Sequence, residues 1–496
     1  MLICNMSKAI IIGSGVAGLA SAARLAALGW QVAVFESNDY PGGKLSQFEL
    51  KGYRFDAGPS LFTLPKLVTE IIEFAGKKVD DYFEFIRCEE ACRYFWDDGT
   101  RLRAWSDAKA FAHEVEEKLA EPSERVLKYL DESAKLYENT HSLFLESSLH
   151  RWQTYLNKEV FSALFNLRSL HLTENLHDIN TKRFKNPKLV QLFDRFATYN
   201  GSSPFLTPGV MQIIPHLEHN VGTYYPKGGM HAITEALYSL GKDLGVEFHF
   251  NSKVDEILLE GRKAIGVKVG GKSFSSDLVV SNADVHPTYR HLLPKQKAPE
   301  KILQQERSSS AFIFYWGISK SFQELGLHNI FFSQDYRKEF KAIFSDKSIP
   351  SDPTVYLNIS SKHTSSDAPE SSENWFVMVN TPGDYGQDWA SIRESLRRTI
   401  IKKINAALNT DIEPFISVEE ILDPPQIESK TSSYKGALYG SASNDTMSAF
   451  LRHPNFSRKL KGLYFVGGSA HPGGGIPLCL LSARITTEII NLDYAI

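Results

Sequence analysis

The sequence predicts an α/β fold built around a parallel sheet, and three segments near the N-terminus carry the prediction. An apolar run at residues 8–12 ends at a glycine cluster, an alanine-rich segment at residues 17–28 has helical spacing, and a second apolar run follows at residues 31–35. Strand, helix and strand in this order form a right-handed βαβ unit. Gly29 follows the helix, where a left-handed residue is wanted. This order is typical of a Rossmann-type nucleotide-binding domain.

Length and composition bound the remaining possibilities. The chain has 496 residues, which is too long for one core and suggests about three folding units, or two large discontinuous ones. Hydrophobic residues make up 42% and charged residues 23%, with a formal net charge of −3. A basic excess is lacking, so we expect no nucleic-acid partner. Four cysteines without paired spacing predict neither a disulfide framework nor a metal site.

Patterns farther along the chain indicate a second domain. Residues 67–220 are dense in aromatic, leucine and charged residues, and we expect a mostly helical insertion there. Short strands are expected within residues 246–281, at 310–318 and at 375–380, and residues 462–490 predict a strand, a glycine loop and a helix. Few apolar residues precede the first strand, and the chain has no run of about 18 apolar residues, so we expect neither export nor a transmembrane helix.

The glycine cluster matches the dinucleotide fingerprint G-x-G-x-x-G in the right context. The first glycine permits a tight turn, the second lets the backbone approach a pyrophosphate, and the third allows close helix packing, while the helix N-terminus attracts phosphate. An acidic residue about 20 positions later is expected to bind the adenosine ribose. The expected contacts from this region are Gly13, Ser14, Gly15, Val16, Ala17, Gly18, Glu36 and Ser37.

Two further strings follow the second strand, Pro41-Gly42-Gly43-Lys44 and residues 53–60, which read Tyr-Arg-Phe-Asp-Ala-Gly-Pro-Ser. Glycines permit close backbone approach, and a lysine adds a charge for phosphate. The strings resemble the flavin-containing amine oxidase and carotenoid desaturase superfamily, in which the Gly-Gly-basic turn touches the pyrophosphate and ribityl side of FAD. The resemblance implies FAD contacts from Gly42, Gly43, Lys44, Gly58, Pro59 and Ser60.

The C-terminal string, residues 462–477, contains His-Pro-Gly-Gly-Gly-Ile-Pro and opens a helix. It resembles the C-terminal FAD motif of bacterial carotenoid desaturases, which lies against the isoalloxazine ring. A helix start can stabilise negative charge on a reduced flavin. We interpret His471 as a structural histidine rather than a general base. The resemblance implies cofactor contacts from Gly467, Gly468, Gly475, Ile476 and Pro477.

Two central strings have counterparts in the same family, Tyr225-Pro-Lys-Gly-Gly-Met and Ser281-Asn-Ala-Asp. The resemblance therefore implies that Asn282 contacts the cofactor and that the strand around Val254 contacts the adenine through its backbone. It also implies a discontinuous fold. Residues 1–66, 222–300 and 425–496 would form the FAD-binding domain. Residues 67–221 and 301–424 would form an α+β substrate-binding domain, in which 140–220 are mostly helical and contact a membrane.

The resemblance covers the whole chain and implies an FAD-dependent desaturase of carotenoids, with FAD held non-covalently. Phytoene desaturases usually read His-Pro-Gly-Ala-Gly-Ile-Pro-Gly, whereas this chain departs at Gly474 and Leu478. The tail from Ile476 to Ile485 looks more like that of the hydroxycarotenoid 3,4-desaturases. We therefore expect C-3,4 desaturation of a 1-hydroxylated acyclic or monocyclic carotenoid. A hydride would leave to the flavin and a proton from the adjacent carbon. No residue pattern identifies a catalytic side chain.

Three alternatives stay open at this point. A phytoene desaturase shares every motif. A flavin amine oxidase shares the nucleotide motifs. Some amine oxidases attach FAD to a cysteine near the C-terminal motif, and Cys479 is the candidate for such a link here. We interpret Cys479 as a buried helix thiol instead. A non-catalytic flavoprotein would use reduced flavin only as a charge.

A polyene substrate requires a long apolar tunnel and is soluble in lipid rather than water. The aromatic residues Phe312, Phe314 and Trp316 are candidates for the tunnel wall, or for the core of a sheet. Residues 151–170 mix aromatic, aliphatic and basic residues, as an interfacial helix or a core helix would. We expect peripheral attachment to the cytoplasmic side of a membrane, and a quinone or oxygen as the final electron acceptor.

Overall fold

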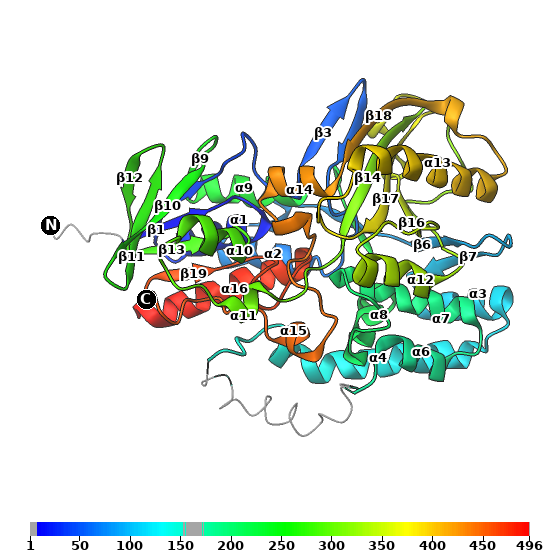
Figure 1. Ribbon diagram of the computed structural model, residues 1–496, viewed down its shortest axis with the longest axis horizontal. Coiled ribbons are helices and arrows are strands. Elements are labelled where there is room, and N and C mark those ends of the chain that lie inside the picture. The colour runs from blue at the N-terminus through cyan, green and yellow to red at the C-terminus, as the bar shows by residue number, and fades with distance from the viewer. Residues whose placement is uncertain (1–6, 152–153, 155–170, 172, 496) are drawn as a thin grey trace.

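A five-stranded parallel sheet forms the end of the molecule that holds both termini (Figure 1). The computed structural model describes residues 7–151, 154, 171 and 173–495. The strand order is β19-β13-β1-β2-β9. The strands are β1 (Lys8–Ile12), β2 (Gln31–Phe35), β9 (Glu247–His249), β13 (Leu278–Ser281) and β19 (Leu463–Phe465). The strands expected at 8–12, 31–35 and 278–281 are confirmed at these bounds.

Both faces of this sheet are covered, which explains why its strands read as continuous apolar runs. Ile10 and Ile12 face a core shared with the antiparallel sheet β10 (Val254–Glu260), β11 (Lys263–Val269) and β12 (Lys272–Ser275). Ala9 and Ile11 face a core shared with α1 (Val16–Ala27) and α16 (Ile476–Tyr494). Gly29 has φ +86, as expected for the residue that ends the first helix.

Two more helices cover the same face as α1 and α16. These are α9 (Ala232–Asp243) and α2 (Lys66–Phe74), and both pack against α1. Residue 67 was expected to begin the second domain, whereas α2 packs into the core of the nucleotide-binding part. Its apolar residues Leu67, Val68, Ile71 and Ile72 recur at helical spacing and turn toward that core.

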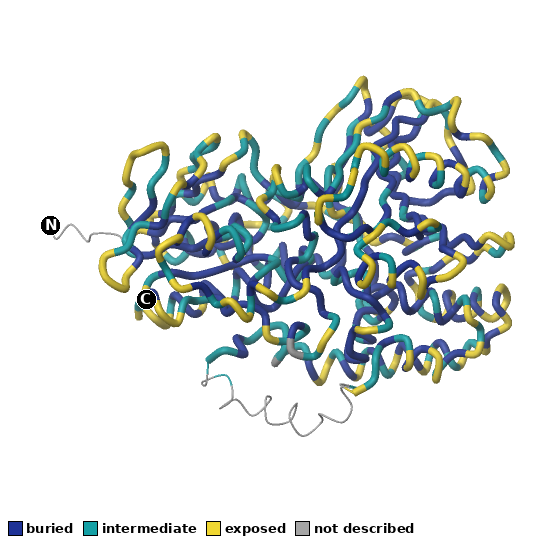
Figure 2. Tube along the Cα trace, in the orientation of Figure 1, coloured by how far each residue is buried: buried dark blue, intermediate teal, exposed yellow. Residues whose placement is uncertain are grey.

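The other end of the molecule is built on a seven-stranded mixed sheet of order β18-β14-β17-β16-β15-β6-β7. Its longest strands, β14 (Ser310–Ile318) and β17 (Glu373–Thr381), pair antiparallel, and all nine residues of β14 are buried. Figure 2 shows this strand in dark blue through the interior. The remaining strands are β6 (Glu90–Phe95), β7 (Arg101–Trp105), β15 (His328–Phe331), β16 (Val355–Asn358) and β18 (Ile416–Leu422).

The expectation of a mostly helical segment from residue 67 is wrong for residues 85–105. They form β5 (Phe85–Arg87), β6 and β7, and β5 pairs with β8 (Tyr224–Pro226). In β7 the exposed Arg101 and Arg103 alternate with the buried Leu102 and Ala104, which is the period of a strand. Strand β6 joins the sheet by pairing with β15, more than 230 residues later, so long-range pairing fixes the structure.

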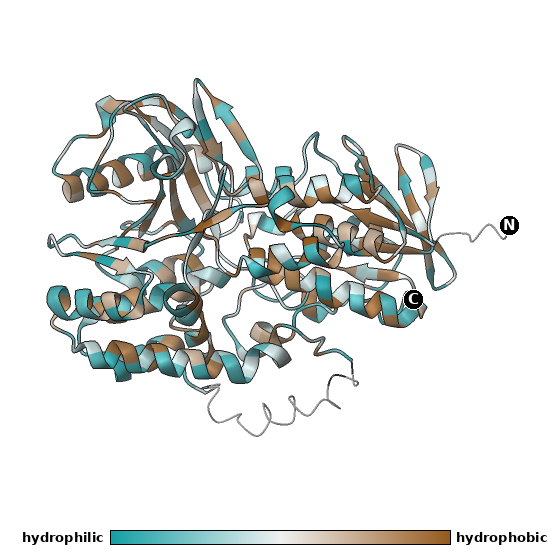
Figure 3. Cartoon of the chain, turned by 180° about the vertical axis from the view of Figure 1, so that it is seen from behind, coloured by the Kyte–Doolittle hydropathy of each residue, from teal (hydrophilic) through white to brown (hydrophobic). Residues whose placement is uncertain are grey.

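Helices form a layer below the seven-stranded sheet in Figure 1. They enclose one core together with β6, β7 and α12 (Tyr336–Lys341), and α13 (Trp389–Leu408) covers the opposite face of the sheet. Apolar residues gather in the strands of both sheets (Figure 3). The helices of the layer are α3 (Ala108–Leu119), α4 (Ser123–Phe144), α6 (Leu176–Arg183), α7 (Pro187–Asp194) and the short α8 (Ile214–His216).

Within the described part of the chain, no helix has both the length and the apolar character needed to cross a membrane. The interfacial helix expected at residues 151–170 lies almost wholly outside the described residues.

Candidate active site

Asn282 stands where the carboxyl ends of β1, β13 and β19 meet. Its backbone N–H donates to the carbonyl of Ile12 (2.8 Å), and its side-chain amide donates to the carbonyl of Val466 (3.3 Å). A Cβ atom added at Gly15 would lie 2.7 Å from the Asn282 oxygen, and one added at Gly467 would lie 2.6 Å from its nitrogen. The glycines therefore make room for Asn282, and this side chain joins the fingerprint to the central and C-terminal motifs.

The fingerprint loop turns directly into α1. Gly13 has φ +92, which favours glycine, and a Cβ at Gly18 would lie 2.2 Å from the Gly13 carbonyl oxygen. The helix begins at Val16, so the N–H groups of Val16 and Ala17 have no acceptor within the helix. Unpaired N–H groups at a helix N-terminus suit a phosphate group.

Glu36 is buried at the end of β2 and is held by the fingerprint loop. One carboxylate oxygen accepts hydrogen bonds from the backbone N–H of Ser14 (2.8 Å) and from its hydroxyl (2.9 Å). The other accepts from the N–H of Asn38 (2.9 Å) and from the hydroxyl of Ser37 (3.1 Å). The side-chain amide of Asn38 donates to the same oxygen (3.0 Å), so the expected ribose contact would replace one of three side-chain donors, Ser14, Ser37 or Asn38. The segment before Val254 lies beside this group, because the N–H of Ser252 donates to the Glu36 carbonyl (2.7 Å).

The Gly42-Gly43-Lys44 turn packs against the fingerprint loop. The N–H of Gly42 donates to the Ser14 carbonyl (2.8 Å), and Gly42 and Gly43 have φ values of +103 and +58. Close approach is required again at Gly58, where a Cβ would lie 1.8 Å from the carbonyl oxygen of Lys44. Lys44 lies before β3 (Gln47–Leu50), and Gly58 lies after β4 (Tyr53–Asp56). A side chain at residue 58 would therefore push these two segments apart.

Lys44 bonds main-chain carbonyls near the C-terminal motif. Its half-buried ammonium group donates to the carbonyls of Ala437 (3.1 Å) and Leu438 (2.9 Å). Burial lowers the pKa of Lys44 to about 8, and the charge of Asp284 partly opposes this shift. The side chain therefore places a cation beside a cavity, and its expected contact with phosphate stays a prediction.

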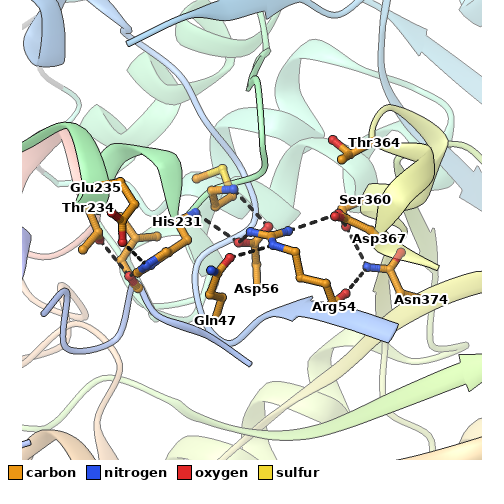
Figure 4. Close-up of polar contacts among 12 residues, drawn as sticks. Gln47, Arg54, Asp56, His231, Thr234, Glu235, Ser360, Thr364, Asp367 and Asn374 are labelled. Atoms are coloured by element: carbon orange, nitrogen blue, oxygen red, sulfur yellow. Dashed lines mark hydrogen bonds and ion pairs between the residues drawn. The ribbon is translucent and has the colours of Figure 1, made fainter. Parts of the chain in front are cut away.

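A polar network ties these motifs to the second sheet (Figure 4). The carboxylate of Asp56 accepts from the N–H groups of Met230 (2.9 Å) and His231 (3.0 Å), just before α9. Arg54 donates to Asp56 (2.8 Å) and to Asp367 (3.1 Å), and the latter follows β16. The motif around residue 225 thus contacts the string at residues 53–60, although the two are far apart in the sequence.

A cavity of about 690 Å³ lies between the two halves of the molecule. Part of its wall consists of residues from the nucleotide-binding motifs, and the N-terminus of α16 opens onto it. The predicted site residues in this wall are Gly43, Lys44, Gly58, Pro59, Ser60, Gly475, Ile476 and Pro477. The second group lies outside the wall and consists of the fingerprint residues 13–18 with Glu36, Ser37, Gly42, Val254, Asn282, Gly467 and Gly468.

The opposite wall is mostly apolar and comes from the second sheet and the helices. Ile313 and Tyr315 of β14 line it, together with Phe376 and Met378 of β17. Of the two alternatives for Phe312, Phe314 and Trp316, the core of a sheet is confirmed, because these side chains pack with those of α13 behind the sheet and do not line the cavity. Successive side chains of a strand point to opposite faces, so the other phase of β14 faces the cavity.

A buried ion pair in the cavity wall was not predicted from the sequence. The guanidinium of Arg195 donates to both carboxylate oxygens of Glu218 (3.1 and 3.2 Å) and to the hydroxyl of Tyr94 (2.7 Å). The hydroxyl of Tyr199 donates to Glu218 as well. Arg195 is 7% and Glu218 1% exposed. Burial opposes the charged form of both groups. Tyr199, Tyr94 and Glu218 nevertheless raise the pKa of Arg195, and the charge of Arg195 lowers that of Glu218, so both stay charged.

A second polar group lies next to the cofactor motifs. The hydroxyls of Ser60 and Tyr356 share a hydrogen bond of 2.7 Å, and Tyr356 also bonds the Nδ1 atom of His328 (2.8 Å). All three side chains line the cavity. A histidine in a strand is most often a core residue, so the sequence offered no signal that would have singled out His328.

His471 and Cys479 are not among the residues that line the cavity. The Nε2 atom of the buried His471 bonds the carbonyl of Ser147 (2.9 Å), and burial lowers its pKa to about 4. This geometry agrees with a structural histidine. Cys479 lies in the first turn of α16, and burial raises the pKa of its thiol to about 11. In the described part of the chain, no three His, Cys, Asp or Glu side chains are arranged to hold a metal ion.

Glycine-lined loops, a helix N-terminus and a cavity beside both are features that would hold a flavin dinucleotide. The family of flavin-containing amine oxidoreductases matches residues 16–491. The chain belongs to this family. The membership makes it an FAD-dependent oxidoreductase. The glycine positions fit that cofactor, because close packing at Gly15 and Gly18 holds the fingerprint loop at the N-terminus of α1, where phosphate groups bind.

Individual relatives indicate which branch of this family the chain resembles. The chain is 55% identical to a 1-hydroxycarotenoid 3,4-desaturase of Flavobacterium sp. (strain P99-3), over 98% of this chain and 99% of the relative. It is 34% identical to a phytoene desaturase of Fusarium fujikuroi, over 98% of this chain and 89% of that one. The resemblance to the carotenoid desaturases is therefore confirmed.

Solved structures show the same fold at low identity. An oxidoreductase from Methanosarcina mazei has a TM-score of 0.65 at 15% identity, covering 97% of this chain and all of that one. A putrescine oxidase variant has a TM-score of 0.64 at 13% identity, covering 98% and 99%. The mixed α/β fold of the FAD-dependent amine oxidases is confirmed.

Proposed function

We propose that this protein is a carotenoid desaturase that introduces a double bond at C-3,4 of a 1-hydroxylated acyclic or monocyclic carotenoid. The observation that carries the proposal is the mostly apolar cavity whose wall includes the flavin motifs Gly58–Ser60 and Gly475–Pro477. An apolar wall such as the one around Ile313 and Phe376 suits a polyene. The 55% identity to a 1-hydroxycarotenoid 3,4-desaturase supports the choice of bond.

Bound FAD supplies the hydride acceptor that desaturation requires, because a hydride and a proton leave adjacent carbons. The residues of this chain prepare the site for that transfer. Lys44, the buried Arg452 and the N-terminus of α16 place positive potential at the wall, where it stabilises additional negative charge. Arg452 donates to the carbonyls of Tyr439 (2.7 Å) and Gly468 (3.2 Å). The apolar wall excludes water and holds the polyene.

Three further proposals complete this function. FAD is bound without a covalent link, since the Cys479 thiol is outside the cavity wall. The enzyme attaches peripherally to the cytoplasmic side of a membrane, because its substrate is soluble in lipid. A quinone or oxygen takes up the electrons. Flotation of the full-length protein with anionic vesicles tests the second proposal, and flavin reoxidation with either acceptor tests the third.

The deciding experiment is expression in two hosts, one accumulating phytoene and the other a 1-hydroxylated carotenoid, with pigment analysis by absorption and mass. We expect the hydroxylated carotenoid alone to lose two hydrogens and to shift to the red. New colour from phytoene would replace the proposal by a phytoene desaturase. No change in either host would favour oxidation of an amine, or a flavoprotein without catalysis.

A further inference from the structure

We propose that the Nε2–H group of His328 donates a hydrogen bond to the tertiary hydroxyl of the substrate and so selects for hydroxylated chain ends. This inference rests on the proposed function, because it concerns how the same cavity recognises one end of the polyene. It adds a specificity-determining residue to the apolar wall.

The hydrogen-bond network fixes which nitrogen of His328 carries the proton. The side-chain amide of Asn358 donates to the carbonyl of Leu327 (3.1 Å), which identifies its nitrogen, and the same nitrogen lies 3.2 Å from Nδ1 of His328. An amide nitrogen only donates, so Nδ1 accepts and the proton of the neutral ring is on Nε2. Strand pairing of His328 with Asn358 holds this arrangement. Burial lowers the pKa of His328 to about 3, which keeps the ring neutral.

The Nε2 atom is a buried donor without a partner among the described residues. His328 is 3% exposed, and it lines the cavity. Most buried donors in proteins are satisfied, so we infer that an unpartnered donor on a residue of the cavity wall meets a ligand atom that accepts a hydrogen bond. The oxygen of an alcohol has two lone pairs and meets this requirement. Arg195 offers a second such donor in the same cavity, because its Nε is also unpartnered among the described residues.

The position of His328 agrees with the position of the reacting bond. In a 1-hydroxylated chain only one carbon separates C1 from C3, so the hydroxyl oxygen lies within about 5 Å of the C-3,4 bond. A group that recognises the hydroxyl must therefore lie beside the cofactor motifs. His328 meets this condition through Tyr356, whose hydroxyl bonds both His328 and Ser60. The polar groups thus mark one end of the substrate, and the apolar wall receives the rest.

The same donor would act against a chain end that lacks the hydroxyl. A methyl-terminated end would leave Nε2–H unpaired in an apolar site, and sites built to bond a substrate hydroxyl reject analogues lacking it strongly. We expect the FAD-loaded wild-type enzyme to prefer a 1-hydroxylated carotenoid over its deoxy analogue by at least tenfold in kcat/KM. The dissociation constants, measured from changes in flavin absorbance, should differ in the same direction.

Two variants separate hydrogen bonding from packing. His328→Leu removes the donor, and we expect at least a tenfold loss of kcat/KM for the hydroxylated substrate and little change for the deoxy analogue. His328→Gln keeps an N–H donor near the position of Nε2 and should restore most of the preference. His291→Leu, at an exposed histidine far from the cavity wall, is the matched control. Flavin content and near-ultraviolet circular dichroism report whether each variant is folded.

The outcomes are distinct. A wild-type preference below twofold, or an unchanged preference in His328→Leu, would overturn the proposal for His328 while leaving C-3,4 desaturation intact. Desaturation of phytoene alone would overturn the proposed function and the inference with it. If His328→Leu is isolated without FAD, the wild-type preference and the His328→Gln variant decide.

Discussion

Removal of one partner of the Arg195–Glu218 pair should destabilise the protein strongly. In Glu218→Gln the guanidinium would keep its bond to the Tyr94 hydroxyl (2.7 Å) and lose its counter-charge at 3.1 Å. Both side chains are more than nine-tenths buried, so water cannot replace the lost charge. Breaking a buried pair on one side typically costs about 3–5 kcal/mol, which is a large share of the stability of a typical protein.

The double variant Arg195→Met, Glu218→Leu should be less damaging than either single change. It removes both charges together, and apolar replacements of a buried pair are often tolerated. Unfolding by urea, followed by tryptophan fluorescence and flavin release, gives the free energy of unfolding for each variant. Glu413→Gln is the control. It breaks the pair between Arg397 and the mostly exposed Glu413, whose charges are 2.6 Å apart, and should cost less than about 1 kcal/mol.

Two results would refute this reasoning. If Glu218→Gln costs no more than Glu413→Gln, the pair is not buried as the structure shows. If the free-energy loss in the double variant equals the sum of the two single losses, the charges do not interact.

Three more predictions follow from the site. Gly18→Ala should lower both stability and FAD content, because the added Cβ would lie 2.2 Å from the Gly13 carbonyl oxygen. The control is Gly29→Asn, in open space at the other end of α1, which should retain FAD. Normal flavin absorbance in Gly18→Ala would contradict the close approach. FAD should be released on denaturation, and Cys479→Ser should keep its flavin content, as absorbance of the filtrate will show. Stability should fall as the pH decreases from about 6.5 to 4. Burial lowers the pKa of His471 to about 4 in the folded protein, so over this range the unfolded chain binds more protons than the folded one. A melting temperature that does not change over this pH range would contradict the prediction.

The parts of the fold that the sequence predicted are those set by local patterns. In β1, α1 and β2 the apolar residues, the glycine loop and Gly29 agree with one another over 30 residues, so neighbouring segments decide the structure. Strands β6 and β7 were missed because each is only five or six residues long and because β6 pairs with β15, which is distant in the sequence. The phase of β14 could not be predicted, since both of its faces are apolar and buried.

The site divides in the same way. The glycine motifs were predictable because close backbone contacts allow no side chain, as at Gly58, where a Cβ would lie 1.8 Å from a carbonyl oxygen. The interior polar groups were not predictable. Arg195 follows the apolar face of α7, and its partner Glu218 comes 23 residues later in the sequence. An isolated charge in an apolar segment was the one available signal, and only the fold shows that the charges face a shared cavity.

The cost of those interior polar groups argues for their role. Buried ion pairs and unpaired donors stabilise a fold less than apolar residues of the same size would, and titratable groups held in such surroundings cluster at functional sites. Arg195, Glu218 and His328 all line a cavity whose other walls are largely apolar. A ligand that is apolar along its length and polar at one end would satisfy both kinds of wall. The chain thus achieves selectivity by leaving a donor unpaired in the unliganded site, and the reaction itself requires little more than correct positioning of the polyene against the flavin.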